Sequence, residues 1–184
     1  MKFGYASGTL VKRFHFNDSS SVDTFSLSFW FFGRGGLRMY FTFEDNKQEE
    51  ALRLWLRLRD QSLLQFYCTG MKSTRTLHKQ FVNGEWHHVG IVYSMNMSAL
   101  KFYLNGNQKF SDELISRGIK AFPSLSLEIE STSPSYAAPL ADVAVWSKEL
   151  TSFEIGTIYS EKTSINRVHF DEVIFQRFES RISE

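Results

Sequence analysis

Apolar and polar residues alternate along much of this chain, which is the pattern of strands with one buried and one exposed face. Residues 52–59 give the clearest case, because four leucines fall on one side of the segment. Four larger side chains fall on the opposite side: Arg53, Trp55, Arg57 and Arg59. Residues 25–32 similarly place one apolar set on one face: Phe25, Leu27, Phe29 and Phe31. A helix would spread these residues around its circumference, so the alternation predicts strands.

Turn and capping signals divide the rest of the chain into short elements. Residues 84–93 and 99–105 also alternate, and the second segment ends in Asn105–Gly106, a pair that favours a tight hairpin turn. Thr151 and Glu154 have the spacing of a capping box, which predicts a short helix. Other strands are expected at residues 10–16, 38–43, 63–69, 74–81, 125–129, 140–146 and 168–175. The predicted fold class is all-β, an antiparallel jelly-roll β-sandwich with one short helix near residues 151–159.

Length and composition suit one domain with an ample core. The chain has 184 residues, 42% hydrophobic and 16% aromatic, without an internal repeat or linker. We therefore expect a single domain over residues 1–184, with its core at residues 9–160 and a C-terminal strand or tail at 166–184. The 18 phenylalanines are a large load for one interior, and surplus ones would mark a protein interface or an oligomer contact. The candidates for that surplus are Phe31, Phe32, Phe41, Phe43, Phe170, Phe175 and Phe178.

The charge balance gives no general attraction to polyanions. The formal net charge is +1, so we expect no nucleic-acid partner. No apolar run approaches the ~20 residues of a membrane span, so we expect no membrane insertion. The single cysteine, Cys68, alternates with apolar residues and is expected to be a buried thiol. An intracellular location is favoured if Met1 is the native start, and an extracellular one if the chain is an excised domain.

Four segments, taken in order, resemble the laminin-G-like, pentraxin-like and concanavalin A-like superfamily. They are Phe25–Trp30, Gly84–Val89, Leu100–Gly106 and Leu140–Leu150, the last followed by Phe153-Glu154-Ile155. Domains of that superfamily carry a G-x-W-H-H-V strand, an L-x-x-Y-x-N-G strand and a D-x-x-x-W-x-x-x-L-x-x-x-E-I ending in this order. The resemblance covers about residues 9–160, and it implies a sandwich built mostly for recognition.

Catalytic signatures are weak in this sequence. Glucanases that share the resemblance carry paired acids in an E-x-D-x-x-E pattern, and the nearest match here is Glu128-Ile129-Glu130, which lacks the third acid. His87 and His88 are neighbours on a strand, so they face opposite sides and cannot chelate one metal together. No nucleophile elbow, phosphate loop or dinucleotide fingerprint occurs. We expect a protein that is not an enzyme, with a glycoside hydrolase of the same fold as the second alternative.

The same resemblance raises the question of calcium, which many such domains hold at one rim of the sandwich. Calcium takes about six to eight oxygen ligands, usually from several acids and backbone carbonyls. The candidate acids are Asp18, Asp23, Glu44, Asp45, Asp112 and Glu113. They form no ligand run, and residues 108–111 replace the acid cluster that pentraxins carry after the Asn-Gly hairpin. We expect no cofactor, with calcium as the alternative.

The outward side chains of residues 52–59 are the best candidate binding surface. Three guanidinium groups around the Trp55 indole suit a sulfated or acidic glycan, or an acidic protein surface. The alternative is a solvated face on which arginine stems cover neighbouring rings. A second candidate site is a loop rim with Arg34 and Tyr40 near the acidic segment 44–50.

These observations predict a non-catalytic recognition module that serves protein interaction or assembly through its exposed sheet face or loop rim. Lectin-like carbohydrate binding is the alternative, so the expected partner is a protein or a glycan. Assembly into a homo- or hetero-oligomer belongs to the first prediction, because surplus aromatic residues would form the contact.

Overall fold

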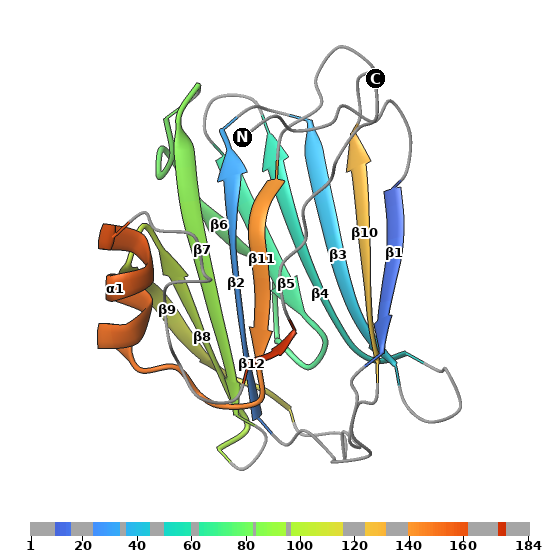
Figure 1. Ribbon diagram of the computed structural model, residues 1–184. Helices are drawn as coiled ribbons and strands as arrows, with labels where there is room; N and C mark the ends of the chain where they lie inside the picture. The colour runs from blue at the N-terminus through green and yellow to red at the C-terminus, as the bar shows by residue number, and fades with distance from the viewer. Residues whose placement is uncertain are drawn as a thin grey trace.

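Two six-stranded antiparallel sheets form the computed structural model (Figure 1). In spatial order the first sheet contains β1 (Leu10–His15), β10 (Ser124–Ser131), β3 (Leu37–Glu44), β4 (Glu50–Arg59), β5 (Leu63–Cys68) and β6 (Arg75–Leu77). The second sheet contains β12 (Val173–Phe175), β11 (Leu140–Trp146), β2 (Thr24–Phe32), β7 (Trp86–Ser94), β8 (Ala99–Leu104) and β9 (Asn107–Glu113). Helix α1 (Ser152–Glu161) lies beside the second sheet. The architecture is the predicted antiparallel β-sandwich with a short helix.

The structure describes residues 10–15, 24–33, 36–44, 50–59, 63–82, 84–94, 97–115, 124–131, 140–161 and 173–175. Within these ranges most strands match the sequence-based prediction to within two residues at each end. The strand expected at residues 74–81 is limited to the three residues of β6. Residues 168–172 of the expected last strand lie outside the described part, which contains β12.

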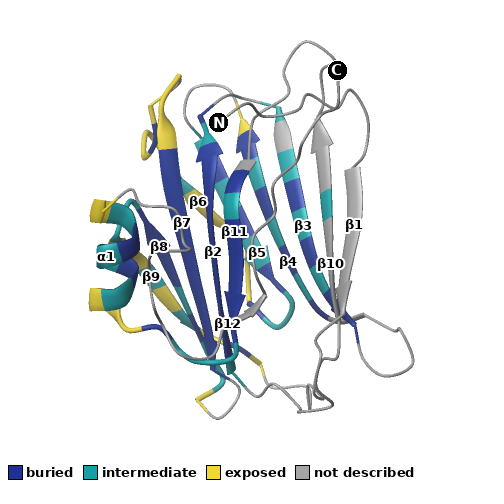
Figure 2. Ribbon diagram, in the orientation of Figure 1, coloured by how far each residue is buried: buried dark blue, intermediate teal, exposed yellow. Residues whose placement is uncertain are grey.

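The inward side chains of both sheets form a single core (Figure 2). The four leucines of β4 are at most 1% exposed, and the apolar set of β2 is fully buried, so both predicted strand faces are confirmed. Cys68 is also buried, as predicted, and burial raises the pKa of its thiol. A buried thiol with a raised pKa is a weak nucleophile, so Cys68 contributes packing rather than reactivity.

The prediction of surplus phenylalanines is wrong for three of the residues named. Phe31, Phe41 and Phe43 are at most 1% exposed, so the interior accommodates them. Ring pairs across the two sheets make this close packing possible. The Phe25 and Phe43 centroids are 4.3 Å apart, and those of Phe29 and Phe41 are 5.2 Å apart. Phe170, Phe178 and the Phe175 side chain lie outside the described residues.

A tight turn at Asn105–Gly106 joins β8 to β9, as the sequence predicted. Both residues have positive φ, 52° for Asn105 and 74° for Gly106, which is the requirement of a two-residue hairpin turn. The strand that follows, β9, was not predicted, because its sequence is almost entirely polar. It nevertheless pairs with β8, from Ala99 opposite Glu113 to Leu104 opposite Asn107. β9 forms one edge of the second sheet, and β12 forms the other.

Side chains on the outer face of the second sheet are buried by α1. Trp146 lies under the helix in a cluster completed by Val92, Tyr103, Ala144, Leu150, Ile155 and Ile158. His88 belongs to the same side, since its ring lies 5.1 Å from the Trp30 ring and 6.4 Å from that of Tyr159. Helix and sheet together therefore form a second, smaller apolar layer.

The two histidines face opposite sides of β7, which confirms the prediction from their spacing. His87 points into the main core, where its ring lies 5.4 Å from that of Phe31 and its Nε2 is 2.9 Å from the Val82 carbonyl oxygen. His88 points toward the helix, and its Nε2 is 2.7 Å from Ser28 Oγ. Both imidazoles are thus buried in the fold.

The predicted capping box is present at the start of α1. The Glu154 backbone N–H donates to Thr151 Oγ1 at 3.2 Å, and the Thr151 N–H donates to Glu154 Oε2 at 2.7 Å. Thr151→Ala removes one of these bonds, so we expect the free energy of unfolding to fall by about 1 kcal/mol in urea denaturation. Thr157→Ala is the matched control, because Thr157 lies inside the helix and its hydroxyl donates to the Phe153 carbonyl rather than capping a helix end. Equal losses in both variants would contradict a capping role.

An ion pair joins the outermost described strands of the two sheets on one side. Arg75 of β6 donates from Nε to Asp112 of β9 at 2.8 Å and pairs with the second carboxylate oxygen as well. The Arg75 guanidinium also lies 5.9 Å from the centre of the Phe110 ring. The contact links β6 and β9 although they belong to different sheets.

Candidate ligand-binding site

Three neighbouring strands of the first sheet present a continuous set of polar and aromatic side chains on their outer face. Their inward residues are buried, so alternation places the remaining residues outward. This set, called the outer face below, consists of Arg38, Tyr40 and Thr42 of β3, Arg53, Trp55, Arg57 and Arg59 of β4, and Gln65 and Tyr67 of β5. All are half-buried except Arg59, which is exposed.

Strand register aligns the aromatic residues of the outer face in one row. Tyr40 is directly opposite Trp55, and Trp55 is directly opposite Tyr67. The centroids of the Trp55 and Tyr67 rings are 6.0 Å apart, and the ring planes are inclined by 29°. Arg53 lies with its guanidinium 4.6 Å from the centre of the Tyr40 ring. The row therefore has two contacts that hold its rings in place.

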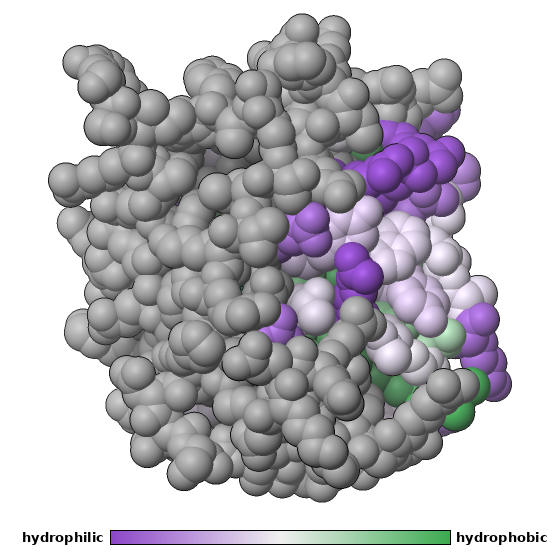
Figure 3. All heavy atoms as spheres, turned by 90° about the vertical axis from the view of Figure 1, so that its right-hand side faces the viewer, coloured by the Kyte–Doolittle hydropathy of each residue, from purple (hydrophilic) through white to green (hydrophobic). Residues whose placement is uncertain are grey.

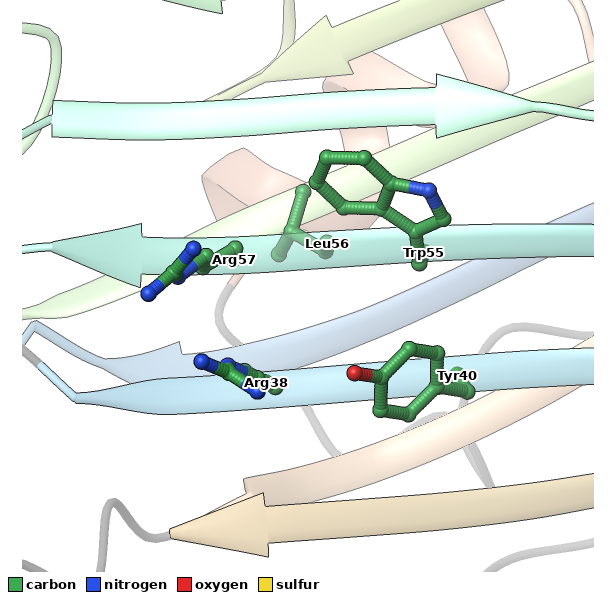
Figure 4. A pocket seen from close by; sticks show the side chains of 5 residues that line it. All are labelled: Arg38, Tyr40, Trp55, Leu56 and Arg57. Atoms are coloured by element: carbon green, nitrogen blue, oxygen red, sulfur yellow. The ribbon is translucent and has the colours of Figure 1, made fainter. Parts of the chain in front are cut away.

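A second row, one pair further along the strands, carries the positive charge. Arg38 is directly opposite Arg57, which in turn is opposite Gln65. Between the two rows lies a hollow of about 220 Å³, lined by Arg38, Tyr40, Trp55, Leu56 and Arg57. Figure 4 shows the two guanidinium groups side by side at one end, with the Tyr40 hydroxyl directed toward Arg38 and the Trp55 ring at the other end.

Two positive charges act on Arg57 at the arginine end of the hollow. Burial, and then the positive charges of Arg38 and Arg59, lower the pKa of Arg57, while the Tyr40 hydroxyl raises it. Arginine remains protonated in proteins, so the result is a concentrated positive charge. Figure 3, which views the molecule from the right of Figure 1, shows strongly hydrophilic and near-neutral side chains over its described part, with some hydrophobic ones toward the lower right.

Acidic residues lie on the far side of β3 from this hollow. In the register of β10 and β3, Glu128 is opposite Tyr40 and Glu130 is opposite Arg38. Glu128 is half-buried, whereas the Glu130 side chain lies outside the described part. β3 thus separates the acids of β10 from Arg57 on β4.

The structure brings together only part of the site that the sequence predicted. Trp55 and Arg57 line the hollow, and Arg53 supports it through the Tyr40 ring. Tyr40 belongs to the same hollow rather than to a loop rim, because it sits in the middle of β3. Arg59 lies at the end of β4 and does not line the hollow, and Arg34 falls outside the described residues.

Sequence reasoning missed Arg38, which lines the hollow directly opposite Arg57. Its signal was present in the alternation of residues 37–44, which places Arg38 on the same side as Tyr40. What the sequence alone did not supply was the register between β3 and β4, which decides which arginine faces which.

The acids considered for calcium do not converge among the described residues. Glu44 is 7% exposed and lies at the end of β3, whereas Asp112 of β9 pairs with Arg75. Asp18, Asp23 and Asp45 lie outside the described residues. No group of three or more His, Cys, Asp and Glu side chains with metal-binding geometry occurs in the part of the chain that was described. None of the described helices is long and apolar enough to cross a membrane.

The fold and its sequence motifs define a class of protein. A family model described as the concanavalin A-like lectin/glucanases superfamily matches residues 7–156. The chain therefore belongs to this superfamily, as its laminin-G-like motifs predicted. No match was found among curated protein sequences.

Solved structures of similar fold include a pentraxin and domains of botulinum neurotoxins. A native heptameric SAP-like pentraxin from Limulus polyphemus has a TM-score of 0.58 at 16% identity, with 86% of this chain and 74% of that chain covered. The receptor-binding domain of a botulinum neurotoxin C/D mosaic serotype has a TM-score of 0.62 at 16% identity, with 88% and 45% covered. The ligand-binding domain of botulinum neurotoxin serotype D, in complex with N-acetylneuraminic acid, has a TM-score of 0.55 at 16% identity, with 85% of this chain and 41% of that chain covered. This chain thus spans less than half of each toxin domain, and the likeness at this identity shows the fold.

Proposed function

We propose that this chain is a non-catalytic binding module that recognises a carbohydrate through the outer face of its first sheet. The observation that carries the proposal is the hollow between β3 and β4, because it combines an aromatic ring, a hydroxyl and two guanidinium groups. An indole offers a flat apolar face to a sugar ring, and the polar groups fix its orientation by hydrogen bonds.

The size of the hollow suits a glycan of which a single sugar ring enters it. Its volume of about 220 Å³ is below the roughly 300–1,000 Å³ that is usual for sites of drug-sized ligands. One sugar ring of a longer glycan suits such a space, while neighbouring rings would extend along the strands over Tyr67 or Arg53. The toxin domain solved with N-acetylneuraminic acid supports a sugar ligand by analogy of fold alone.

Recognition of a protein partner through the same face is the second candidate, and the sequence favoured it. Tyrosine, tryptophan and arginine dominate the binding energy of protein interfaces, and all three residue types are present here. However, protein interfaces also have an apolar centre. The large apolar side chains that are exposed among the described residues lie elsewhere: Val82, Trp86, Met97, Ile115 and Phe153. This distribution supports the carbohydrate as the first candidate.

Loss of the Trp55 ring provides the test. We expect Trp55→Ala to weaken the binding of any glycan selected on an array by about tenfold or more, because the stacking surface is removed. Binding is measured by titration calorimetry with the selected glycan. Trp86→Ala is the matched control, since Trp86 is also partly exposed, at 37%, but belongs to the second sheet.

Three results would overturn the proposal. Equal binding by wild type and Trp55→Ala would exclude this face, and no binding to any glycan would favour the protein candidate. Release of reducing sugar from the bound glycan, abolished in Glu128→Gln, would instead support the glycoside hydrolase alternative.

A further inference from the structure

We infer that the arginine end of the hollow binds the anionic substituent of an acidic sugar, a carboxylate or a sulfate, between Arg38 and Arg57. This inference rests on the proposed function and specifies its ligand class. It concerns a site formed by two residues from adjacent strands, Arg38 and Arg57, of which only Arg57 was named as a candidate from the sequence.

The first argument is the arrangement of like charges. Arg38 and Arg57 are direct cross-strand partners, and like charges in that position destabilise a sheet. Arg59 adds a third positive charge to the environment of Arg57, and partial burial adds a desolvation cost. An anion bound at Arg57 between the two guanidinium groups reverses both effects there, because it offsets the repulsion and accepts hydrogen bonds from the Arg57 donors.

The second argument is the geometry of the donors. A guanidinium group offers a planar fork of N–H donors that matches a carboxylate or a sulfate. The two forks lie side by side at one end of the hollow, and the Tyr40 hydroxyl is directed to the same end (Figure 4). The Trp55 ring lies at the other end, so a sugar ring stacked on it would carry its charged substituent toward the arginines.

The acidic positions nearest to the hollow are on a strand that does not pair with β4. Glu128 and Glu130 are on β10, which is separated from β4 by the whole width of β3. The charged groups that act on Arg57 are Arg38, Arg59 and the ionisable Tyr40. Arg57 is therefore the residue whose removal is expected to affect an anionic ligand most.

The test compares acidic sugars with their neutral counterparts. Sialyllactose is titrated against lactose, and a glucuronyl disaccharide against its glucosyl and its 6-sulfated glucosyl forms. For wild type we expect the acidic member of a pair to bind about tenfold more tightly than the neutral one, which is the effect of one charge-assisted hydrogen bond. The carboxylated and sulfated arms distinguish the two sources of negative charge.

Variants then test whether the tighter binding of the acidic sugar depends on the arginine pair. We expect Arg57→Gln to abolish the preference for the acidic sugar, and Arg57→Lys to retain only part of it, because lysine keeps the charge and loses the planar fork. Arg59→Gln is the matched control: it removes the same charge from the same strand, but its side chain does not line the hollow. We expect this control to change the affinity by about twofold or less. Melting temperatures in the absence of sugar verify that all variants fold.

Each other outcome separates the inference from the proposed function. Equal affinity for acidic and neutral sugars, still dependent on Trp55, would overturn the inference and leave the carbohydrate function standing. An equal loss in Arg59→Gln would replace the site by a general charge effect. Binding of a glutamate-rich peptide that requires Arg57, without binding of any sugar, would overturn both in favour of an acidic protein partner.

Discussion

Replacing Trp146 by alanine is expected to lower the free energy of unfolding by about 3 to 5 kcal/mol, the range for removing a large aromatic side chain from a core. Trp146 is fully buried and is the largest such side chain of the described residues. Its indole fills the space between β11 and α1, where Leu150, Ile155 and Ile158 surround it. The change leaves a cavity that the helix can close only by shifting toward the sheet. Urea denaturation followed by circular dichroism measures the loss.

Trp146→Phe separates packing from hydrogen bonding at the same position. The indole Nε1 is buried and has no hydrogen-bond partner among the described atoms, so phenylalanine removes an unsatisfied donor while keeping most of the ring volume. We expect this variant to lose only about 1 kcal/mol. A loss as large as that of the alanine variant would contradict the view that Trp146 acts through its volume.

Acidification from pH 7.5 to pH 5 is expected to lower the free energy of unfolding by about 2 kcal/mol through His88 alone. Burial lowers the pKa of His88 from its ordinary value to about 3, because a charged imidazole would lose its hydration beneath α1. In the unfolded chain the same group takes up a proton near pH 6.5. Between these two values only the unfolded state gains the proton, so stability decreases as the pH falls, by about 1.4 kcal/mol per pH unit well below pH 6.5.

The comparison of wild type with His88→Gln isolates this effect. Glutamine does not titrate, and its amide reaches for the same Ser28 hydroxyl that lies 2.7 Å from His88 Nε2. We expect the variant to be less stable at pH 7.5 and to have a flatter pH dependence down to pH 5. The capping carboxylate of Glu154 does not interfere, because hydrogen bonds from Thr151 and Lys148 outweigh its burial and keep its pKa below the ordinary value. A slope equal to that of wild type would exclude His88 as its source.

The fold was largely predictable because local and long-range requirements agree along most strands. In β4 the leucines must lie in the core and the arginines outside it, so only one face of the strand can be directed toward the core. The capping box of α1 and the turn at Asn105–Gly106 were predictable for the same reason, since each depends on residues that are close in sequence. β9 was not predictable, because a polar edge strand is specified by pairing with β8 and not by its own alternation.

The candidate site was predictable only in part, because it depends on register between strands. The outward direction of Trp55 and Arg57 follows from alternation within β4. That Arg38 faces Arg57, and that Tyr40 faces Trp55, follows from the pairing of β3 with β4. A shift of two residues would have kept every side chain on its face and assembled a different site. The expected surplus of phenylalanines failed for a related reason, since the capacity of an interior depends on how rings from two sheets interlock.

The Arg75–Asp112 ion pair bears on how copies of this chain behave at high concentration. An edge strand has unpaired backbone N–H and C=O groups, so a strand of another molecule can pair with it and start aggregation. Here the Arg75–Asp112 ion pair connects the two edge strands on one side, β6 and β9. β6 also has only three residues with which another strand could pair. Charged groups at such an edge also disfavour the approach of a second apolar strand. On this side the sandwich therefore offers a further strand only a short edge and a charged one, a combination that disfavours fibril growth.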